Sequence, residues 1–398
     1  MKLPGGLQRI VARVSDQLLW SFALFGFNFG ASLLFAASGF AALAVATALA
    51  FIVIAMVRAW TANARIIAGA KVGLAPEQSL DIRSSLIVSV VGAAATAAIT
   101  AVWIFQTESL TNTLAFSILA GFLVLADTPR QLLIYSKKYK SSIWISAVYA
   151  LTSAISLLVA HLFSSAEMLI WIWYTGTLAA LLLGLVLQRR GVARPTRKLR
   201  VGAYAWRLGA EALYAGVASQ LAILLLYWIE PPSTTAGYRL AYSLVFAPAF
   251  MVIQGLSPLY TARLANTYLV RSEKLGTSGA LWSSAITVLV VVCGLAAGLA
   301  TILFPDYSNL VAALPYILPV GLSLLGAQLV EAAFQAVRFT RPPTFTHRLR
   351  IVVIGADLAI QVVTLVFAGV DGLVVGIAAV GIVKIAAAVV FQVRVARR

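Results

Sequence analysis

Eight charged side chains interrupt otherwise apolar stretches of the sequence, and they are its main candidates for chemistry. They are Asp127, Arg130, Arg207, Glu211, Arg239, Glu331, Asp357 and Lys384. If these stretches cross a membrane, each buried charge costs about 2.5–3.5 kcal/mol on insertion scales, so such groups usually pair or line a water-filled cavity. Arginine and lysine there could bind an anion, and carboxylates could carry a proton.

Asp127 and Arg130 lie three residues apart in one apolar stretch, on either side of Pro129. Residues three apart share a helix face, so the pair could form an intrahelical salt bridge beside a proline kink. Alternatively, the pair faces a cavity, where Arg130 binds a phosphate group through its planar guanidinium and Asp127 titrates. Arg130 is thus a candidate substrate-binding cation and Asp127 a candidate coupling carboxylate.

Asp357 and Lys384 lie in the last two apolar stretches. Asp357 is about seven residues, or roughly 10 Å, from the predicted inner end of its stretch, and Lys384 about nine residues, or roughly 14 Å, from its own. Similar depths on adjacent antiparallel helices predict a direct ion pair, which favours a structural role. If they face a cavity instead, Lys384 is a substrate-binding cation and Asp357 a coupling carboxylate.

Arg207 and Glu211 lie four residues apart at the predicted inner mouth of a later stretch, where a solvated pair is the expected arrangement. Arg239 lies near the predicted outer end of the next stretch. Its side chain could snorkel to lipid headgroups or to Glu230, or it could face a central cleft and receive an anion.

Glu331 is a lone carboxylate near the inner end of a predicted span, which makes it the best single candidate for proton coupling unless Arg338 neutralises it. Its position also suggests an internal repeat. Asp127 and Gln131 are four residues apart, and Glu331 and Gln335 repeat that spacing 204 residues later. Residues four apart share a helix face, so each pair would project from one side of its helix.

The composition requires these charges to be positioned by membrane-spanning helices. Hydrophobic residues make up 61% of the 398 residues, charged residues only 11%, and the mean hydropathy is +0.95. A soluble chain would carry about a quarter charged residues. Windows of about 20 apolar residues, long enough to cross a bilayer, lie at 17–37, 39–57, 84–105, 112–134, 143–163, 167–187, 209–229, 236–259, 279–303, 310–334, 350–369 and 372–393.

The basic residues predict how these twelve spans are oriented. Most of the 30 Lys and Arg residues fall before the first span, in every second loop, and after the last span. By the positive-inside rule, both termini are cytoplasmic. The net charge of +17 therefore reflects topology rather than nucleic-acid binding, with contact to anionic membrane lipids as a by-product. Tryptophans near span ends, such as Trp103 and Trp228, are typical of the membrane interface.

The residue inventory argues against an enzyme. The chain has one cysteine, Cys293, and two widely separated histidines, His161 and His347, so no metal centre or histidine-based triad is expected. No Gly-rich phosphate-binding motif occurs in the longest predicted inner loops, 59–83 and 189–208. The predicted outer loops are too short to hold a catalytic domain. We expect neither a catalytic residue nor a cofactor.

The spans divide into two similar halves. The basic segment 191–207 separates six predicted helices in 1–190 from six in 208–398. Asp16 and Glu211 occupy similar places at the start of each half. Two halves around a central cleft are the arrangement that an alternating-access transporter needs.

Two stretches of the sequence resemble a known family. The first comprises Ser15-Asp16-Gln17, Ser21, Asn28-Phe29, Gly39-Phe40 and Arg58-Ala59. The second comprises Ala236-Gly237-Tyr238-Arg239-Leu240-Ala241, Pro248 and Gly255-Leu256. They are similar to the first two spans and the eighth span of polysaccharide-biosynthesis flippases, of the O-antigen type, in the multidrug/oligosaccharidyl-lipid/polysaccharide (MOP) exporter superfamily. The Asn28-Phe29 register is shifted relative to that family, and the two extra spans typical of the lipid II flippase are lacking.

This resemblance implies an all-α, MATE-like fold in the bacterial inner membrane. It also implies a transporter that moves a polyprenyl-pyrophosphate-linked oligosaccharide between leaflets, with glycan-assembly proteins as possible partners. Two alternatives stay open. One is a drug or cation antiporter of the same superfamily, and the other is a non-transporting scaffold of a glycan-assembly complex.

Overall fold

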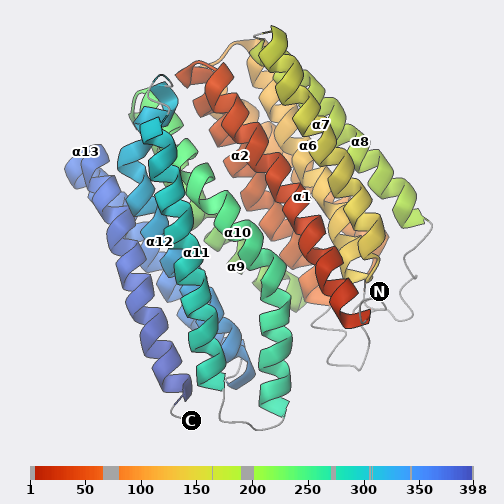
Figure 1. Cartoon of the computed structure of the whole chain (residues 1–398), viewed down its shortest axis with the longest axis vertical. Helices are drawn as coiled ribbons and strands as arrows, with labels where there is room; N and C mark the ends of the chain where they lie inside the picture. Colours follow the sequence, from red (N-terminus) through yellow and green to blue (C-terminus); the bar gives the residue numbers. More distant parts are fainter. Residues whose placement is uncertain are drawn as a thin grey trace. The chain divides into compact units, whose positions relative to one another are not determined.

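The computed structural model describes residues 5–65, 80–163, 165–189, 201–269, 275–303, 306, 308–340 and 343–396, and all regular secondary structure within them is helical (Figure 1). The elements are α1 (Gly5–Leu34), α2 (Ala37–Arg58), the π-helical turn η1 (Ala59–Asn63), α5 (Ile82–Ile104), α6 (Leu110–Tyr135), α7 (Tyr139–Phe163), α8 (Ala166–Arg189), α9 (Gly202–Ile229), α10 (Pro232–Leu269), α11 (Leu275–Leu303), α12 (Ser308–Thr340) and α13 (Pro343–Ala396).

The predicted all-helical membrane fold is confirmed. Each of the twelve apolar windows falls on helix, and within the described residues ten segments are long and apolar enough to cross a bilayer. The longest, His347–Gln392, covers both of the last two predicted spans. The chain is a multi-pass membrane protein.

Helix α13 consists of two arms joined at a tight break. Ala368 (φ −137°, ψ 16°) and Gly369 (φ 60°, ψ −146°) leave the helical conformation. A backbone with positive φ strains residues that carry a Cβ, so glycine suits this position. The break lies where the sequence predicts the turn between spans 350–369 and 372–393.

The predicted inner loop 59–83 is wrong at its start. The helix continues beyond Arg58 through η1 and on to Arg65. Within this turn the Thr61 hydroxyl donates to the carbonyl oxygen of Val57 at 2.7 Å. The two arginines suggest a solvated loop, but both have carboxylate partners within the first part of the chain, Asp127 for Arg58 and Asp81 for Arg65.

The helices form two compact units, residues 1–227 and 228–398. Helix α9 groups with the first unit, so this boundary differs from the predicted halves 1–190 and 208–398. Part of the predicted linker 191–207 lies outside the described residues, and the division into two six-helix halves stays a prediction.

In the first unit, helices α1, α5, α6, α7 and α8 are packed together with α2 (Figure 1). Helix α1 contacts α7, α7 contacts α8, α8 contacts α6, and α2 packs on both α5 and α6. Helix α2 is the most deeply buried of the ten candidate spans, and all its residues from Phe40 to Ala50 are buried. It therefore serves as the core of this unit.

Helix α5 has the polarity expected of a helix at the edge of a bundle in lipid. Its outward face carries large apolar side chains such as Val91 and Val102, which are 64% and 76% exposed. Its buried face is small and hydroxyl-rich: Ser85, Ser89, Gly92, Ala93, Thr96, Thr100 and Ile104. Small residues allow neighbouring helices to approach closely when lipid removes the usual hydrophobic driving force. Asp81 caps the helix by accepting from the Ser84 backbone N–H at 3.2 Å.

In the second unit, α12 contacts α10, α11 and α13. Its closest approach to α13 occurs at two glycines. A Cβ built on Gly381 would lie 2.5 Å from the carbonyl carbon of Leu322, and one on Gly326 would lie 2.5 Å from the carbonyl oxygen of Gly381. Backbone cannot yield as a flexible side chain can, so these positions require glycine.

We expect Gly381→Ala to destabilise the protein by about 1–3 kcal/mol, the usual cost of overpacking, as measured by thermal unfolding in detergent. Gly355→Ala on the same helix is the matched control, since a Cβ there meets nothing within 4 Å. The control should be neutral or stabilised by up to about 1 kcal/mol, because alanine favours a helix over glycine. Equal melting temperatures for the two variants would contradict the packing described here.

Candidate functional site: a buried ionic cluster in the first unit

Four charged residues from three helices meet in the first unit. We call Asp16 of α1, Arg58 of α2, and Asp127 and Arg130 of α6 the ionic cluster. Asp16, Asp127 and Arg130 are at most 1% exposed. The cluster holds two cations and two anions, so it is formally neutral.

Arg58 and Asp127 form the tightest pair of the cluster. Arg58 Nε donates to Asp127 Oδ2 at 2.6 Å, and Arg58 Nη2 donates to Oδ1 at 2.5 Å. This two-pronged geometry matches the planar guanidinium to the carboxylate and gives strong charge-assisted hydrogen bonds. The intrahelical contact predicted between Asp127 and Arg130 is present but longer, at 3.5 Å.

Arg130 uses its donors on groups of α1 and α7. Its Nη2 donates to Asp16 Oδ2 and to Gln17 Oε1, each at 2.9 Å, and its Nε donates to Ser146 Oγ at 3.1 Å. Ser146 in turn donates to Asp16 Oδ1 at 2.8 Å. The guanidinium also lies 4.6 Å from the ring centroid of Trp20, a distance typical of a cation–π contact.

Gln131 connects the two arginines. With its carboxamide oxygen turned toward the cluster, Gln131 accepts from Arg58 Nη2 at 3.0 Å and from Arg130 Nη1 at 3.3 Å. Its neighbour Pro129 also has a partner, because Gln188 of α8 donates to the Pro129 carbonyl oxygen at 3.1 Å. The proline that the sequence singles out thus lies in a hydrogen-bonded part of α6.

These contacts give the two arginines different capacities. The Arg130 side chain is fully buried, and its neighbours already accept from all three of its nitrogens. This does not favour the predicted role of Arg130 as a substrate-binding cation. The Arg58 side chain is 33% exposed, and among the described residues nothing accepts a hydrogen bond from its Nη1. Arg58 is therefore the cluster member able to bind an external group.

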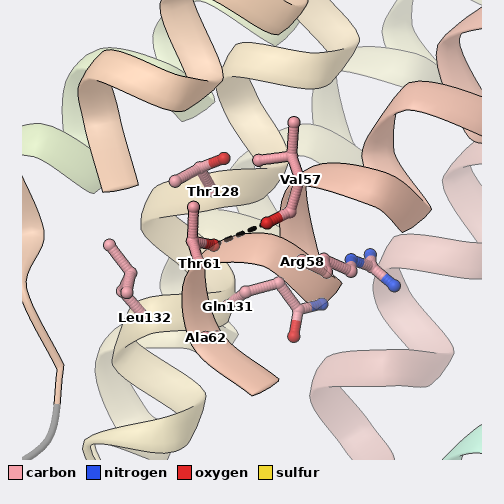
Figure 2. Close-up of a pocket in the computed structure, with 7 residues that line it drawn as sticks. All are labelled: Val57, Arg58, Thr61, Ala62, Thr128, Gln131 and Leu132. Carbon is pink, nitrogen blue, oxygen red and sulfur yellow. Dashed lines mark hydrogen bonds between the residues drawn. The ribbon is translucent and has the colours of Figure 1, made fainter. Parts of the chain in front are cut away.

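A pocket lies beside Arg58. It is a small pocket, lined by Val57, Arg58, Thr61, Ala62, Thr128, Gln131 and Leu132 (Figure 2). Arg58 and Gln131 extend toward the same side of it in Figure 2. The π-helical turn η1 contributes Thr61 and Ala62, so the pocket depends on the helix continuing past Arg58. Such turns are frequent at functional sites.

The predicted ion pair between Asp357 and Lys384 is present in the second unit. The two residues lie on opposite arms of α13, and Lys384 Nζ donates to Asp357 Oδ2. Gln361, one turn from Asp357, donates to its other carboxylate oxygen at 2.6 Å. These contacts match the structural interpretation. They leave little support for Lys384 as a substrate-binding cation or Asp357 as a coupling carboxylate.

Glu331 is not a lone carboxylate, which corrects the prediction. Arg350 of α13 donates to Glu331 Oε2 at 3.0 Å, with side-chain exposures of 23% for Arg350 and 33% for Glu331. The predicted partner Arg338 and the repeat residue Gln335 have side chains outside the described part of the structure. Glu331 is far more exposed than Asp127, so the repeat in sequence does not give two equivalent environments.

Arg239 does not snorkel to a surface, contrary to one of its two predicted arrangements. It is 1% exposed on α10, and its guanidinium carbon lies 5.8 Å from the ring centroid of Tyr242, one turn away. Arg207 is exposed on α9 and Glu211 is half-buried one turn further along, as expected at the end of a span.

The sequence alone indicates Asp127 and Arg130 as candidates but not the other two members of the ionic cluster. Arg58 falls in a predicted loop, and Asp16 and Arg58 stand out only through the flippase-like motif and, for Asp16, through its similarity in position to Glu211. Gln17 lies in the motif that resembles the flippases, which is a usable signal. Ser146 carries none, because it is one of many serines in an apolar helix.

Comparisons of the sequence give no match, either to protein-family models or to curated proteins. Comparison of the structure with solved structures does give matches. It is similar to an inward-facing multidrug-resistance MATE family transporter of the MOP superfamily, with a TM-score of 0.64, 11% identity, and coverage of 97% of this chain and 98% of that one. A MATE protein in a straight conformation gives a TM-score of 0.62, 15% identity and full coverage of both chains. The MATE transporter ClbM in complex with Rb⁺ gives 0.54, 12% identity, and coverage of 96% and 92%.

Proposed function

We propose that the chain is a transporter that flips a polyprenyl-pyrophosphate-linked oligosaccharide across the cytoplasmic membrane by alternating access. The starting point is its fold, which it shares over nearly its whole length with MATE transporters of the MOP superfamily. The sequence resemblance to polysaccharide flippases favours a lipid-linked glycan as the substrate. Proteins of glycan assembly and anionic lipids are the proposed partners.

The charge balance of the interior is the observation that carries the choice of substrate. Three carboxylates are buried in the described residues, and each has a cationic partner: Asp16 has Arg130, Asp127 has Arg58, and Asp357 has Lys384. A cationic drug requires an available carboxylate, whereas an anionic headgroup requires an available cation. Arg58 supplies the cation, and guanidinium binds phosphate through two parallel hydrogen bonds.

The cluster offers a way to release Arg58 for this task. A pyrophosphate group at Arg58 would compete with Asp127 for the same guanidinium. Asp127 Oδ1 already lies 3.5 Å from Arg130 Nη1, so a small side-chain shift would exchange one cationic partner for the other. The buried carboxylate would then stay neutralised while the substrate is bound, which avoids the cost of an unpaired buried charge.

Outward movement of an anionic headgroup carries negative charge across the membrane. At 100 mV each elementary charge that crosses the membrane is worth about 2.3 kcal/mol, and with the cell interior negative this favours anion exit but opposes anion return. A substrate that carries two or more negative charges also needs its charge balanced within the protein. Proton or cation movement coupled to the cycle is therefore part of the proposal.

Two other functions have support of their own. The neighbouring structures include a multidrug transporter and a transporter that binds Rb⁺, which favours a drug or cation antiporter. The mutual neutralisation of Asp357 and Lys384 would equally suit a membrane scaffold without transport. The transport assay below separates the three.

The test uses the purified full chain in proteoliposomes loaded with a fluorescent polyprenyl-pyrophosphate oligosaccharide. The fraction of label accessible to an external quencher is followed over time. We expect faster exchange between leaflets than in protein-free vesicles. Efflux of ethidium without lipid exchange would establish the antiporter instead, and the absence of both activities would favour the scaffold.

A further inference from the structure

The interface between α5 and α6 contains a line of buried hydroxyl groups with unequal surroundings. We call it the hydroxyl seam; its members are Ser89, Thr96 and Thr100 of α5 and Thr113, Ser117 and Thr128 of α6. All six are at most 5% exposed. A row of small polar residues can serve close helix packing alone, so the row by itself does not indicate a binding site. The hydrogen bonds of its members divide the seam into two halves.

The contacts between the helices fix which residues face one another. Thr128 donates to Ser89 Oγ at 2.8 Å, and Ser89 donates to the Val124 carbonyl oxygen at 3.3 Å. Further along, a Cβ on Gly121 would lie 3.0 Å from the Ala93 carbonyl oxygen. The helices are antiparallel, so each step forward on α5 is a step backward on α6. This register places Thr100 between Thr113 and Ser117 of α6.

One half of the seam is fully hydrogen-bonded. Ser89 and Thr128 bond to each other, as above. Thr96 donates to the carbonyl oxygen of Gly92, four residues earlier, at 2.7 Å. Such a bond to the preceding turn is the usual way for a threonine to satisfy its hydroxyl inside a helix.

The other half is not. Thr100, Thr113 and Ser117 are 0%, 2% and 3% exposed, and across the described ranges of the chain nothing donates to or accepts from their hydroxyl groups. A buried hydroxyl without a partner loses its hydrogen bonds to water and gains none in return, which is unfavourable. Thr100 does not adopt the bond to the preceding turn that Thr96 makes four residues earlier, and Thr113 and Ser117 do not either. Three such groups that converge on one place point to a shared partner.

We propose that the seam between Thr100, Ser117 and Thr113 is a binding site for ordered water. A buried water molecule typically makes two to four hydrogen bonds to otherwise unsatisfied polar groups, and three hydroxyls provide that number. Each hydroxyl can both donate and accept, so one or two water molecules can satisfy all three.

Bound water changes the expected effect of removing the hydroxyls. If water bridges them, Thr100→Val and Ser117→Ala remove hydrogen bonds and leave the water without partners, so the stability of the protein falls. If the hydroxyls are simply unsatisfied, the same substitutions remove a penalty and stability rises. The sign of the change therefore distinguishes bound water from packing alone. Thr96→Val is the matched control, because it removes a hydroxyl whose partner lies in its own helix.

The test combines two measurements on the full chain in lipid. Solid-state NMR with isotope-labelled threonine and serine measures magnetisation transfer from water. We expect transfer at Thr100, Thr113 and Ser117 that exceeds transfer at Thr96. The second measurement is the melting temperature of the Thr100→Val/Ser117→Ala double variant, which we expect to fall below that of the wild type. Thr96→Val shows the effect of losing a hydroxyl that is bonded within its own helix.

Water transfer at Thr100 and Ser117 no greater than at Thr96 would overturn the proposal, as would a double variant that melts above the wild type. If the double variant fails to fold, the measurement on the wild-type protein decides alone. The site is independent of the transported substrate, so a negative flipping assay leaves this inference untouched.

Discussion

Replacing Arg130 with alanine is expected to destabilise the first unit by about 3–5 kcal/mol, the cost of leaving a buried charge without its partner. Asp16 is 1% exposed and, among the described residues, would keep as a hydrogen-bond donor only Ser146. Gln17 and Trp20 would also lose their contacts with the guanidinium. The measurement is thermal unfolding of the purified protein in detergent, together with the yield of folded protein from membranes.

A double-mutant cycle separates the lost pair from the lost side chain. Arg130→Met combined with Asp16→Asn removes both charges and keeps similar volumes. We expect this double variant to be more stable than the sum of the two single losses, by about 0.5–3 kcal/mol. Additive losses, or a wild-type melting temperature for Arg130→Met, would show that the two groups do not interact as described.

Replacing Arg58 with alanine is expected to lower the flipping rate by about ten- to a hundredfold, the equivalent of losing about 1.5–3 kcal/mol from hydrogen bonds to a charged group. Stability should fall less than for Arg130→Ala, because Asp127 lies 3.5 Å from Arg130, which can take over as its partner. Arg58→Lys should recover only part of the rate, since an ammonium group cannot form the bidentate contact. The proteoliposome assay measures the flipping rates of both variants, and thermal unfolding in detergent measures their stability.

Arg65→Ala provides the matched control for Arg58. Arg65 lies two turns further along the same helical stretch and also bonds to an aspartate, Asp81, at 3.2 Å, but it does not line the pocket. We expect flipping by Arg65→Ala to stay near the wild-type rate. Equal rates for Arg58→Ala and the wild type would remove Arg58 from the substrate path while leaving the transporter proposal intact.

Local sequence properties predict the helices of this protein well. Apolar length predicts where the helices lie, because the thickness of the bilayer sets the length of a span. The orientation that the basic loops indicate stays a prediction. The pair Asp357–Lys384 could also be predicted. The two residues lie on consecutive antiparallel spans joined by a short turn, so depth along each helix is enough to bring them together.

The ionic cluster could not be predicted in the same way. Arg58 and Asp127 are 69 residues apart, and Asp16 and Arg130 are 114 apart, so their meeting depends on which helices pack together. Spacing along one helix favours the pair Asp127–Arg130, but that contact is the longest in the cluster. A basic residue at the end of an apolar window also predicts the start of a loop, so the pattern gives no reason to place Arg58 in the interior.

The break at Ala368 and Gly369 has a consequence for biogenesis. The charges of Asp357 and Lys384 sit on opposite arms of α13, so either arm alone would carry an uncompensated charge into the hydrocarbon. Neutralisation requires both arms to be present. The C-terminal region should therefore leave the translocon as a helical hairpin. Truncation within the second arm should prevent the first arm from leaving the translocon for the lipid.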